Sequence, residues 1–268
     1  MTITLRNNVL RLSLLLTILL LLGFFVLIGL LYLPPQSLGQ LRAVLKVDGA
    51  ITPLLSLAES LFLVAFSVAA GILLQIFFRK TVSSEMFFFI FFVISLSLEA
   101  VRAGQLYIQI VDLPPYYGVV LTRVAYFGRF FGLFCLFVSG LYATGIDYQR
   151  FEVVLGISLL IAFTLAFTIP VNSQPPAERL VNGIGGADQI LAAFFALELF
   201  SVLNFVLAST LKRSRNHLFM AAGLLLVVAG VDLLYFTASL APAIAGAVLL
   251  AAGSFVFGNR THEVYLWS

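Results

Sequence analysis

LSLLLTILLLLGFFVLIGLLYL, residues 12–33, contains no charged side chain in 22 positions. An α-helix rises about 1.5 Å per residue, so this stretch can cross a hydrocarbon layer about 30 Å thick. Similar apolar runs recur along the chain, and 62% of all residues are hydrophobic while only 10% are charged. Soluble domains carry roughly 25% charged residues. The composition therefore excludes a water-soluble fold and predicts a polytopic membrane protein.

The apolar runs and short loops use nearly the whole length, so we expect one integral membrane domain covering residues 1–268. Its fold class is predicted to be all-α, a transmembrane bundle of eight spans, namely one N-terminal anchor plus seven. The predicted spans are residues 12–33, 52–78, 86–110, 116–143, 153–170, 189–211, 218–238 and 241–257. The last has only 17 residues, the lower limit for a crossing.

The distribution of lysine and arginine predicts the orientation. If the amino terminus is cytoplasmic, nine basic residues fall on the cytoplasmic side and three outside. The nine are Arg6, Arg11, Arg79, Lys80, Arg150, Lys212, Arg213, Arg215 and Arg260, and the three are Arg42, Lys46 and Arg179. Because cytoplasmic loops are enriched in Lys and Arg, we expect both termini in the cytoplasm and the protein in a bacterial inner (plasma) membrane.

The first span follows Arg6 and Arg11 and so imitates a secretory signal. A signal peptide has an apolar core of about 7 to 15 residues, shorter than the run here, and a retained anchor is expected. The proline pairs Pro34–Pro35, Pro114–Pro115 and Pro175–Pro176 are predicted to mark helix exits on the external side. The loop 171–188 is interpreted as a flexible connector.

Several kinds of chemistry lack the side chains that they need. The three lysines, Lys46, Lys80 and Lys212, lie in loops or at membrane boundaries, so no Schiff-base chromophore is expected. His217 and His262 fall at the predicted cytoplasmic surface, which disfavours embedded haem or zinc and leaves a membrane serine hydrolase without its base. We therefore predict no cofactor, no metal site and no catalytic residue. The small net charge of +3 is spread over loops, so no nucleic-acid partner is expected.

Seven ionisable residues lie inside the predicted spans. They are Glu59, Glu99, Arg102, Arg123, Arg129, Glu198 and Asp232. Each costs about 2.5 to 3.5 kcal/mol at a helix centre unless it is compensated. Five of them are expected at one level, roughly 9 to 14 Å below the outer surface, with Glu99 and Arg129 nearer the midplane.

Helical spacing predicts some of their neighbours. Ser95, Glu99, Arg102 and Gln105 form one polar stripe on a helix whose other faces are apolar enough for lipid, and Glu99 can pair with Arg102. In the next span Tyr126 shares a face with Arg129, whereas Arg123 points about 120° away from Arg129. The two arginine side chains should therefore contact different neighbouring helices.

Three interpretations of this charged layer remain open. The first is a structural network that holds helices in register. The second is an outward-opening pocket in which Arg102, Arg123 or Arg129 binds a carboxylate or a lipid phosphate. The third is a proton-coupled role for a lone acid such as Glu198 or Asp232. The predicted ligand-binding set is Glu59, Glu99, Arg102, Arg123, Tyr126, Arg129, Glu198 and Asp232.

Three function classes follow. We favour a non-catalytic membrane protein, either sensor-like or an accessory subunit, that acts through partner proteins. A secondary transporter of a small anionic or lipid-like solute is the alternative, and a lipid-active membrane enzyme is third. Expected partners are the lipid bilayer, a membrane protein or a second copy of the chain, and a small anionic or lipid ligand. The glycine pair Gly128 and Gly132 permits a dimer, but packing within the chain is favoured.

Overall fold

The computed structural model describes residues 3–32, 52–78, 83–146, 150–173, 180–237 and 239–266. Within these ranges it has eight helices that are long and apolar enough to cross a membrane. Its elements are α1 (Ile3–Tyr32), α3 (Thr52–Phe77), α4 (Ser84–Ser95), η1 (Leu96–Ala100), α5 (Val101–Val111), α6 (Pro115–Ala143), α7 (Phe151–Thr168), α8 (Ala187–Leu211), α9 (Arg215–Phe236) and α10 (Leu240–Leu266). The predicted all-helical fold is confirmed for this part of the chain, and its eight long apolar helices are compatible with a multi-pass membrane protein.

Most predicted boundaries agree with the helices to within three residues, but the two terminal helices are longer. Helix α1 begins at Ile3, and α10 ends at Leu266. The α10 helix therefore continues past residue 257, the predicted end of the eighth span, because polar side chains extend it beyond the apolar run. Arg260 and Glu263 form an ion pair one turn apart there, with 2.6 Å between Nη1 and Oε2.

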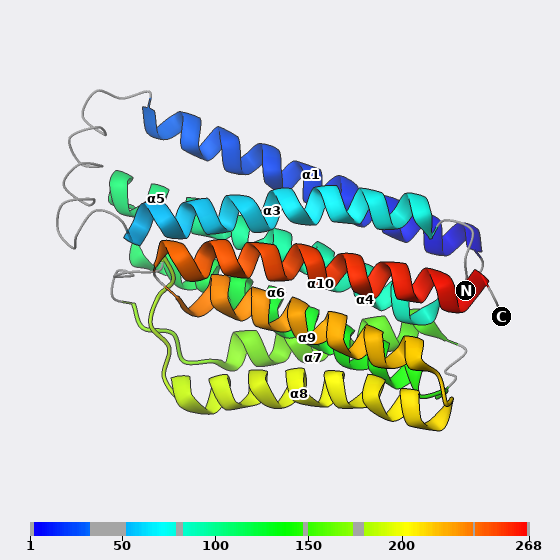
Figure 1. Cartoon of the computed structure of the whole chain (residues 1–268). Helices are drawn as coiled ribbons and strands as arrows, with labels where there is room; N and C mark the ends of the chain where they lie inside the picture. The colour runs from blue at the N-terminus through cyan, green and yellow to red at the C-terminus, as the bar shows by residue number, and fades with distance from the viewer. Residues whose placement is uncertain are drawn as a thin grey trace.

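The helices run side by side along one long direction (Figure 1). The first residue of α1 and the last of α10 lie at the same end, as an even number of crossings requires (Figure 1). We call this end, where α6 and α8 terminate, the predicted inner end. The opposite end, where α6 and α8 begin, is the predicted outer end. Of the proline pairs, Pro114 lies between α5 and α6 and Pro115 is the first residue of α6, and the other two pairs lie outside the described residues.

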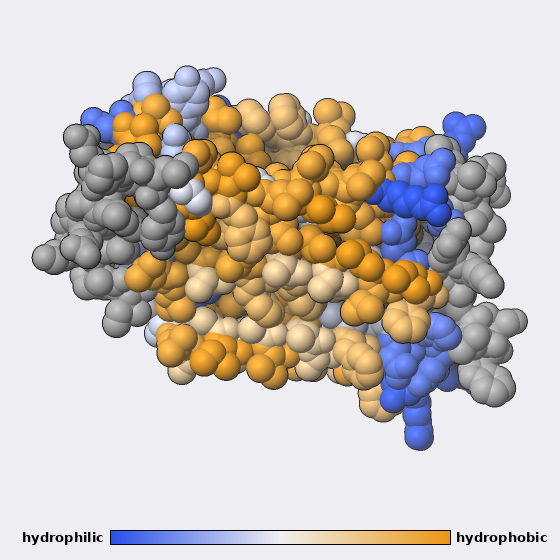
Figure 2. All heavy atoms as spheres, turned by 90° about the horizontal axis from the view of Figure 1, so that it is seen from above, coloured by the Kyte–Doolittle hydropathy of each residue, from blue (hydrophilic) through white to orange (hydrophobic). Residues whose placement is uncertain are grey.

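The outside of the bundle is suited to lipid. Figure 2 shows a broad hydrophobic band over its middle and hydrophilic residues toward its ends. Large apolar side chains stand exposed on α1, α7 and α8, including Leu12 (70%), Leu160 (64%) and Leu199 (57%). These three helices have few buried residues and form the periphery.

The third crossing, which runs from α4 through η1 to α5, lies at the centre of the bundle. Every residue from Glu85 to Ser95 is buried. The apolar faces of this helix, although fit for lipid, therefore contact other helices. A helix that is apolar all round fits a protein core as well as it fits a membrane, so hydropathy does not separate the two settings.

The turn of 3₁₀-helix at η1 interrupts this central rod where Glu99 lies. At its start, the Ser95 hydroxyl donates to the carbonyl of Phe92 and the Ser97 hydroxyl donates to the carbonyl of Ile94, both at 2.7 Å. Such side-chain bonds compete with the regular helical pattern. A 3₁₀ segment inside a long helix often marks a hinge or a functional position.

Candidate functional site: a buried charge network

The first half of the network surrounds Arg102, which is only 1% exposed. Its Nε donates to Oε2 of Glu99 at 2.7 Å, so the pair predicted from spacing is confirmed. Its Nη1 donates to the Ser56 hydroxyl at 3.0 Å and lies 3.9 Å from Oε2 of Glu59. Since Ser56 and Glu59 belong to α3, the guanidinium joins the central rod to a neighbouring helix.

The second half surrounds Arg129 of α6. Its Nη2 donates to Oδ1 of Asp232 on α9 at 2.6 Å and lies 3.6 Å from Oε1 of Glu198 on α8. Three rings also face this guanidinium, those of Phe194, Tyr235 and Phe236, with centroids 4.2 to 4.5 Å from its carbon. Aromatic faces attract a cation, so the cage favours the charged arginine in a site with little water.

The two halves meet at Tyr235. Its ring lies 4.9 Å from the guanidinium carbon of Arg102 and 4.2 Å from that of Arg129. Six of the eight predicted site residues thus belong to one connected assembly, drawn from α3, η1, α5, α6, α8 and α9. We call this assembly, Glu59, Glu99, Arg102, Arg129, Glu198 and Asp232 with Tyr235, the charge network. Tyr235 was absent from the predicted set, because no sequence pattern indicates an aromatic ring placed between two cations.

The other two predicted residues lie beside the charge network. Tyr126 stacks on Phe194, with centroids 6.3 Å apart, and so contacts the cage around Arg129. Arg123 faces α7 instead, with its guanidinium carbon 5.7 Å from the Phe167 ring. It is half-buried and forms no ion pair with any residue that the structure describes. The prediction that Arg123 and Arg129 address different neighbours is confirmed.

The loop between α7 and α8 covers the predicted outer side. Asn182 donates through its backbone N–H to the Thr122 hydroxyl at 3.1 Å, and Thr122 accepts from the Gln105 amide at 2.9 Å. Leu180, 1% exposed, packs on Leu106. The described residues of this loop are thus held against α5 and α6 by these contacts. The interpretation of the loop as a flexible connector does not fit them.

The predicted inner side is closed by aromatic packing. The α4 segment from Met86 to Ile94 contains five phenylalanines, all buried. Glu85, at the start of α4, is a buried acid that sequence reasoning missed. It accepts from the Ser83 hydroxyl at 3.1 Å, and Ser83 caps α4 by accepting from the backbone N–H of Met86, so a serine before an apolar run is the helix-start signal at this position.

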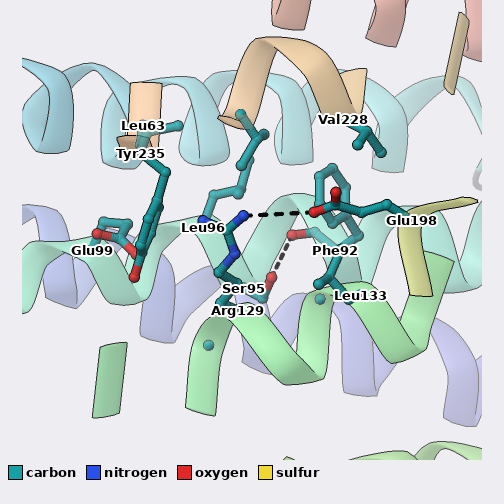
Figure 3. A pocket seen from close by; sticks show the side chains of 13 residues that line it. Leu63, Phe92, Ser95, Leu96, Glu99, Arg129, Leu133, Glu198, Val228 and Tyr235 are labelled. Atoms are coloured by element: carbon teal, nitrogen blue, oxygen red, sulfur yellow. Dashed lines mark hydrogen bonds and ion pairs between the residues drawn. The ribbon is translucent and has the colours of Figure 1, made fainter. Parts of the chain in front are cut away.

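The charge network contains four carboxyl groups that can bind or release protons, but it leaves little room for a ligand larger than water. A cavity of about 30 Å³, which fits one or two waters, lies among Glu99, Arg129 and Glu198 (Figure 3). Two guanidinium groups face four carboxyl groups. Comparisons of the chain with protein-family models, with curated proteins and with solved structures found no match.

Proposed function

We propose that the protein is a non-catalytic sensor-like or accessory subunit of a bacterial inner membrane that acts through partner proteins. Its ligand would be a small anion or a lipid phosphate bound in the predicted outer half of the bilayer. The proposed binding set is the charge network together with Arg123 and Tyr126. The observation that carries the proposal is that the buried ion pairs of Arg102 and Arg129 lie in one half of the bundle, while buried rings of α4 fill the other half.

Arg123 is the proposed point of first contact. Arg102 and Arg129 already have carboxylate partners within 2.7 Å, whereas Arg123 has none among the described residues. It lies eight residues after Pro115, about 12 Å along α6, and helical side chains lean toward the helix N-terminus. The guanidinium is therefore directed toward the predicted outer surface, where anionic groups are found.

A route for the signal runs through η1. This segment contacts α1, α3 and α6, and it carries Glu99 of the charge network. A ligand that shifts α6 would therefore change the contacts of the central rod. Because the α4 segment from Met86 to Ile94 is buried and apolar, helix movement is a better mode of action here than passage of a solute.

Thermal unfolding of the full chain in nanodiscs tests the proposal. The probes are inorganic phosphate, acetate, and nanodiscs containing phosphatidylglycerol in place of phosphatidylcholine. A ligand at one hundred times its Kd stabilises by about 2.7 kcal/mol, a Tm rise of about 5 to 10 °C for a chain of this size. Arg123→Ala should abolish this rise while Arg123→Lys retains part of it. Phosphate in solution and phosphatidylglycerol distinguish a soluble anion from a lipid headgroup.

The matched control is Arg213→Ala, which removes an exposed arginine at the predicted inner end. It should melt like the wild type with and without each probe. A rise that survives in Arg123→Ala would contradict the assignment of this residue. No rise with any of the probes would contradict the proposed ligand class.

A secondary transporter is the second candidate, and the excess of buried carboxyl groups over guanidinium groups favours it. Buried acids in a membrane frequently serve ion or proton pathways. Counterflow of a small anionic solute into proteoliposomes, lost in Asp232→Asn, would support this class over a sensor. Its absence across a panel of carboxylates and phosphates would leave the sensor or accessory role.

A further inference from the structure

The cavity inside the charge network is small, and residues of six elements, α3, α4, η1, α6, α8 and α9, form its walls. Ser95 of α4, Glu99 of η1, Arg129 of α6, Glu198 of α8 and Tyr235 of α9 line it. Figure 3 shows Glu99 and Glu198 on opposite sides of the Arg129 side chain. The volume of about 30 Å³ suits one or two water molecules and excludes larger ligands.

Three polar atoms on two residues that line this cavity have no hydrogen-bond partner among the described residues. They are Oε2 of Glu198 and both Nε and Nη1 of Arg129, on side chains that are at least nine-tenths buried. A buried donor or acceptor without a partner costs about 1 to 3 kcal/mol, and internal water commonly removes that cost. The lining offers donors on Arg129 and an oxygen on Glu198, which one water can bridge.

The formal charges around the cavity do not balance. Glu59 of α3 and Glu99 of η1 face Arg102 of α5, and Glu198 of α8 and Asp232 of α9 face Arg129 of α6. The remaining titratable groups beside them, Tyr126 and Tyr235, are neutral near pH 7. With every carboxyl ionised, the described residues of this region would carry a formal charge of −2. Such a charge is costly within a membrane unless a proton or a cation compensates for it.

The two carboxyl groups that share Arg129 lie at different distances from its guanidinium group. Asp232 lies at 2.6 Å from Nη2 and accepts a hydrogen bond, as an ionised partner does. Glu198 is 3.6 Å from the same nitrogen, too far for a hydrogen bond, and its second oxygen lines the cavity. Two carboxyl groups that share a site are not readily ionised together, and the one held less closely keeps the proton.

We propose that Glu198 is a proton-binding site within the membrane, and that water in the adjoining cavity is the path by which this proton exchanges. The proton sits on Oε2 and donates to that water, which also accepts from Arg129. Loss of the proton would leave two carboxylates competing for one guanidinium, so the packing of α6, α8 and α9 would depend on pH. A metal cation in the same cavity would meet the positive charge of Arg129, which disfavours it. The site does not depend on the anion proposed to bind at Arg123.

Infrared spectroscopy of the full chain in nanodiscs tests the proton directly. A protonated carboxyl has a C=O stretching band distinct from that of a carboxylate. The wild type at neutral pH should show such a band, and the band should shift in D₂O because the proton exchanges through water. Glu198→Gln should remove it, while Glu263→Gln, at an exposed ion pair, should leave it unchanged. Absence of the band in the wild type, or its persistence in Glu198→Gln, would overturn the assignment.

Stability provides a second, independent readout. Glutamine has nearly the shape of a neutral glutamic acid, so Glu198→Gln should fold and keep its Tm within about 3 °C of the wild type. Asp232→Asn removes the ionised partner of Arg129 and should lower the Tm by a clearly larger amount. Failure of Glu198→Gln to fold, or equal losses in the two variants, would contradict a neutral Glu198. The wild-type Tm could instead rise with NaCl but not with choline chloride, and this rise could be lost in Glu198→Gln. That result would overturn the proposal, because it would show that the site binds a sodium ion and not a proton.

Discussion

Two ion pairs of this protein have almost the same geometry and opposite surroundings. Glu99 and Arg102 lie three residues apart with 2.7 Å between charged atoms, and Arg260 and Glu263 lie three residues apart at 2.6 Å. The first pair is at most 6% exposed, and the second is 35% to 36% exposed. Exposed pairs contribute about 0 to 1 kcal/mol, whereas removing one member of a buried pair costs about 3 to 5 kcal/mol.

Glu99→Gln should therefore lower the free energy of unfolding by about 3 kcal/mol or more, and Glu263→Gln by less than about 1 kcal/mol. Denaturant titrations of both variants in the same detergent measure the difference. The double variant Arg102→Met with Glu99→Leu should be less destabilised than the sum of the Arg102→Met and Glu99→Leu single changes, because the ion pair between these two residues is lost in each single variant and is counted twice in the sum. Equal small losses in the two single variants would mean that water screens the Arg102 pair.

Residue spacing along one helix predicted contacts within that helix and no more. The pairing of Glu99 with Arg102, and the divergence of Arg123 from Arg129, follow from 100° per residue. The position of Tyr235 between two guanidinium groups depends on how three helices pack. No single-helix periodicity contains that information, so the central ring of the charge network could not be predicted.

At the scale of elements, α9 and α10 pack with their backbones in close approach. A Cβ added to Gly253 of α10 would lie 2.6 Å from the carbonyl oxygen of Gly223 and 2.7 Å from the backbone nitrogen of Val227. Both atoms belong to the α9 backbone, so neither can turn aside as a side chain could. Small residues at such positions allow helices to approach within membranes.

Gly253→Ala should therefore destabilise the protein by about 1 to 3 kcal/mol, the usual range for overpacking. Gly156→Ala is the control, because Gly156 lies in a helix, on exposed α7, with nothing within 4 Å of the added Cβ. Alanine favours a helix over glycine by about 1 kcal/mol, so the control should be neutral or stabilised. Thermal unfolding of both variants measures the contrast. Similar Tm values would show that α9 and α10 can separate without cost.

The close helix packing at another glycine pair is predictable from the sequence alone. Gly128 and Gly132 face the central rod, where an added Cβ would meet Leu98 and Ser95 respectively. Packing of this pair within the chain is therefore confirmed. What the sequence could not predict is that the rod is central, because lipid tails and a protein core select the same apolar side chains.

Considered as a whole, the molecule has two unlike halves, and its orientation decides which side of the membrane each one faces. The charge network, Arg123 and the loop that carries Asn182 lie toward the predicted outer end, and the phenylalanines of α4 lie toward the predicted inner end. Lys212 and Arg213 follow α8 at the predicted inner end, and these basic residues favour that end as the cytoplasmic one. A ligand from outside could reach the polar half only in this orientation.

Cysteine labelling measures that orientation with little background, because the single native Cys135 is 0% exposed. Leu113 and Ile146 stand at opposite ends of α6 with exposures of 36% and 42%, and neither carries charge that sets topology. In intact cells a membrane-impermeant maleimide should label Leu113→Cys, and it should label Ile146→Cys only after permeabilisation. The 29 residues of α6 span about 43 Å, longer than the hydrocarbon layer, so both sites should reach water. Labelling of Ile146→Cys in intact cells, with Leu113→Cys protected, would place the polar half toward the cytoplasm and remove the external ligand from the proposal.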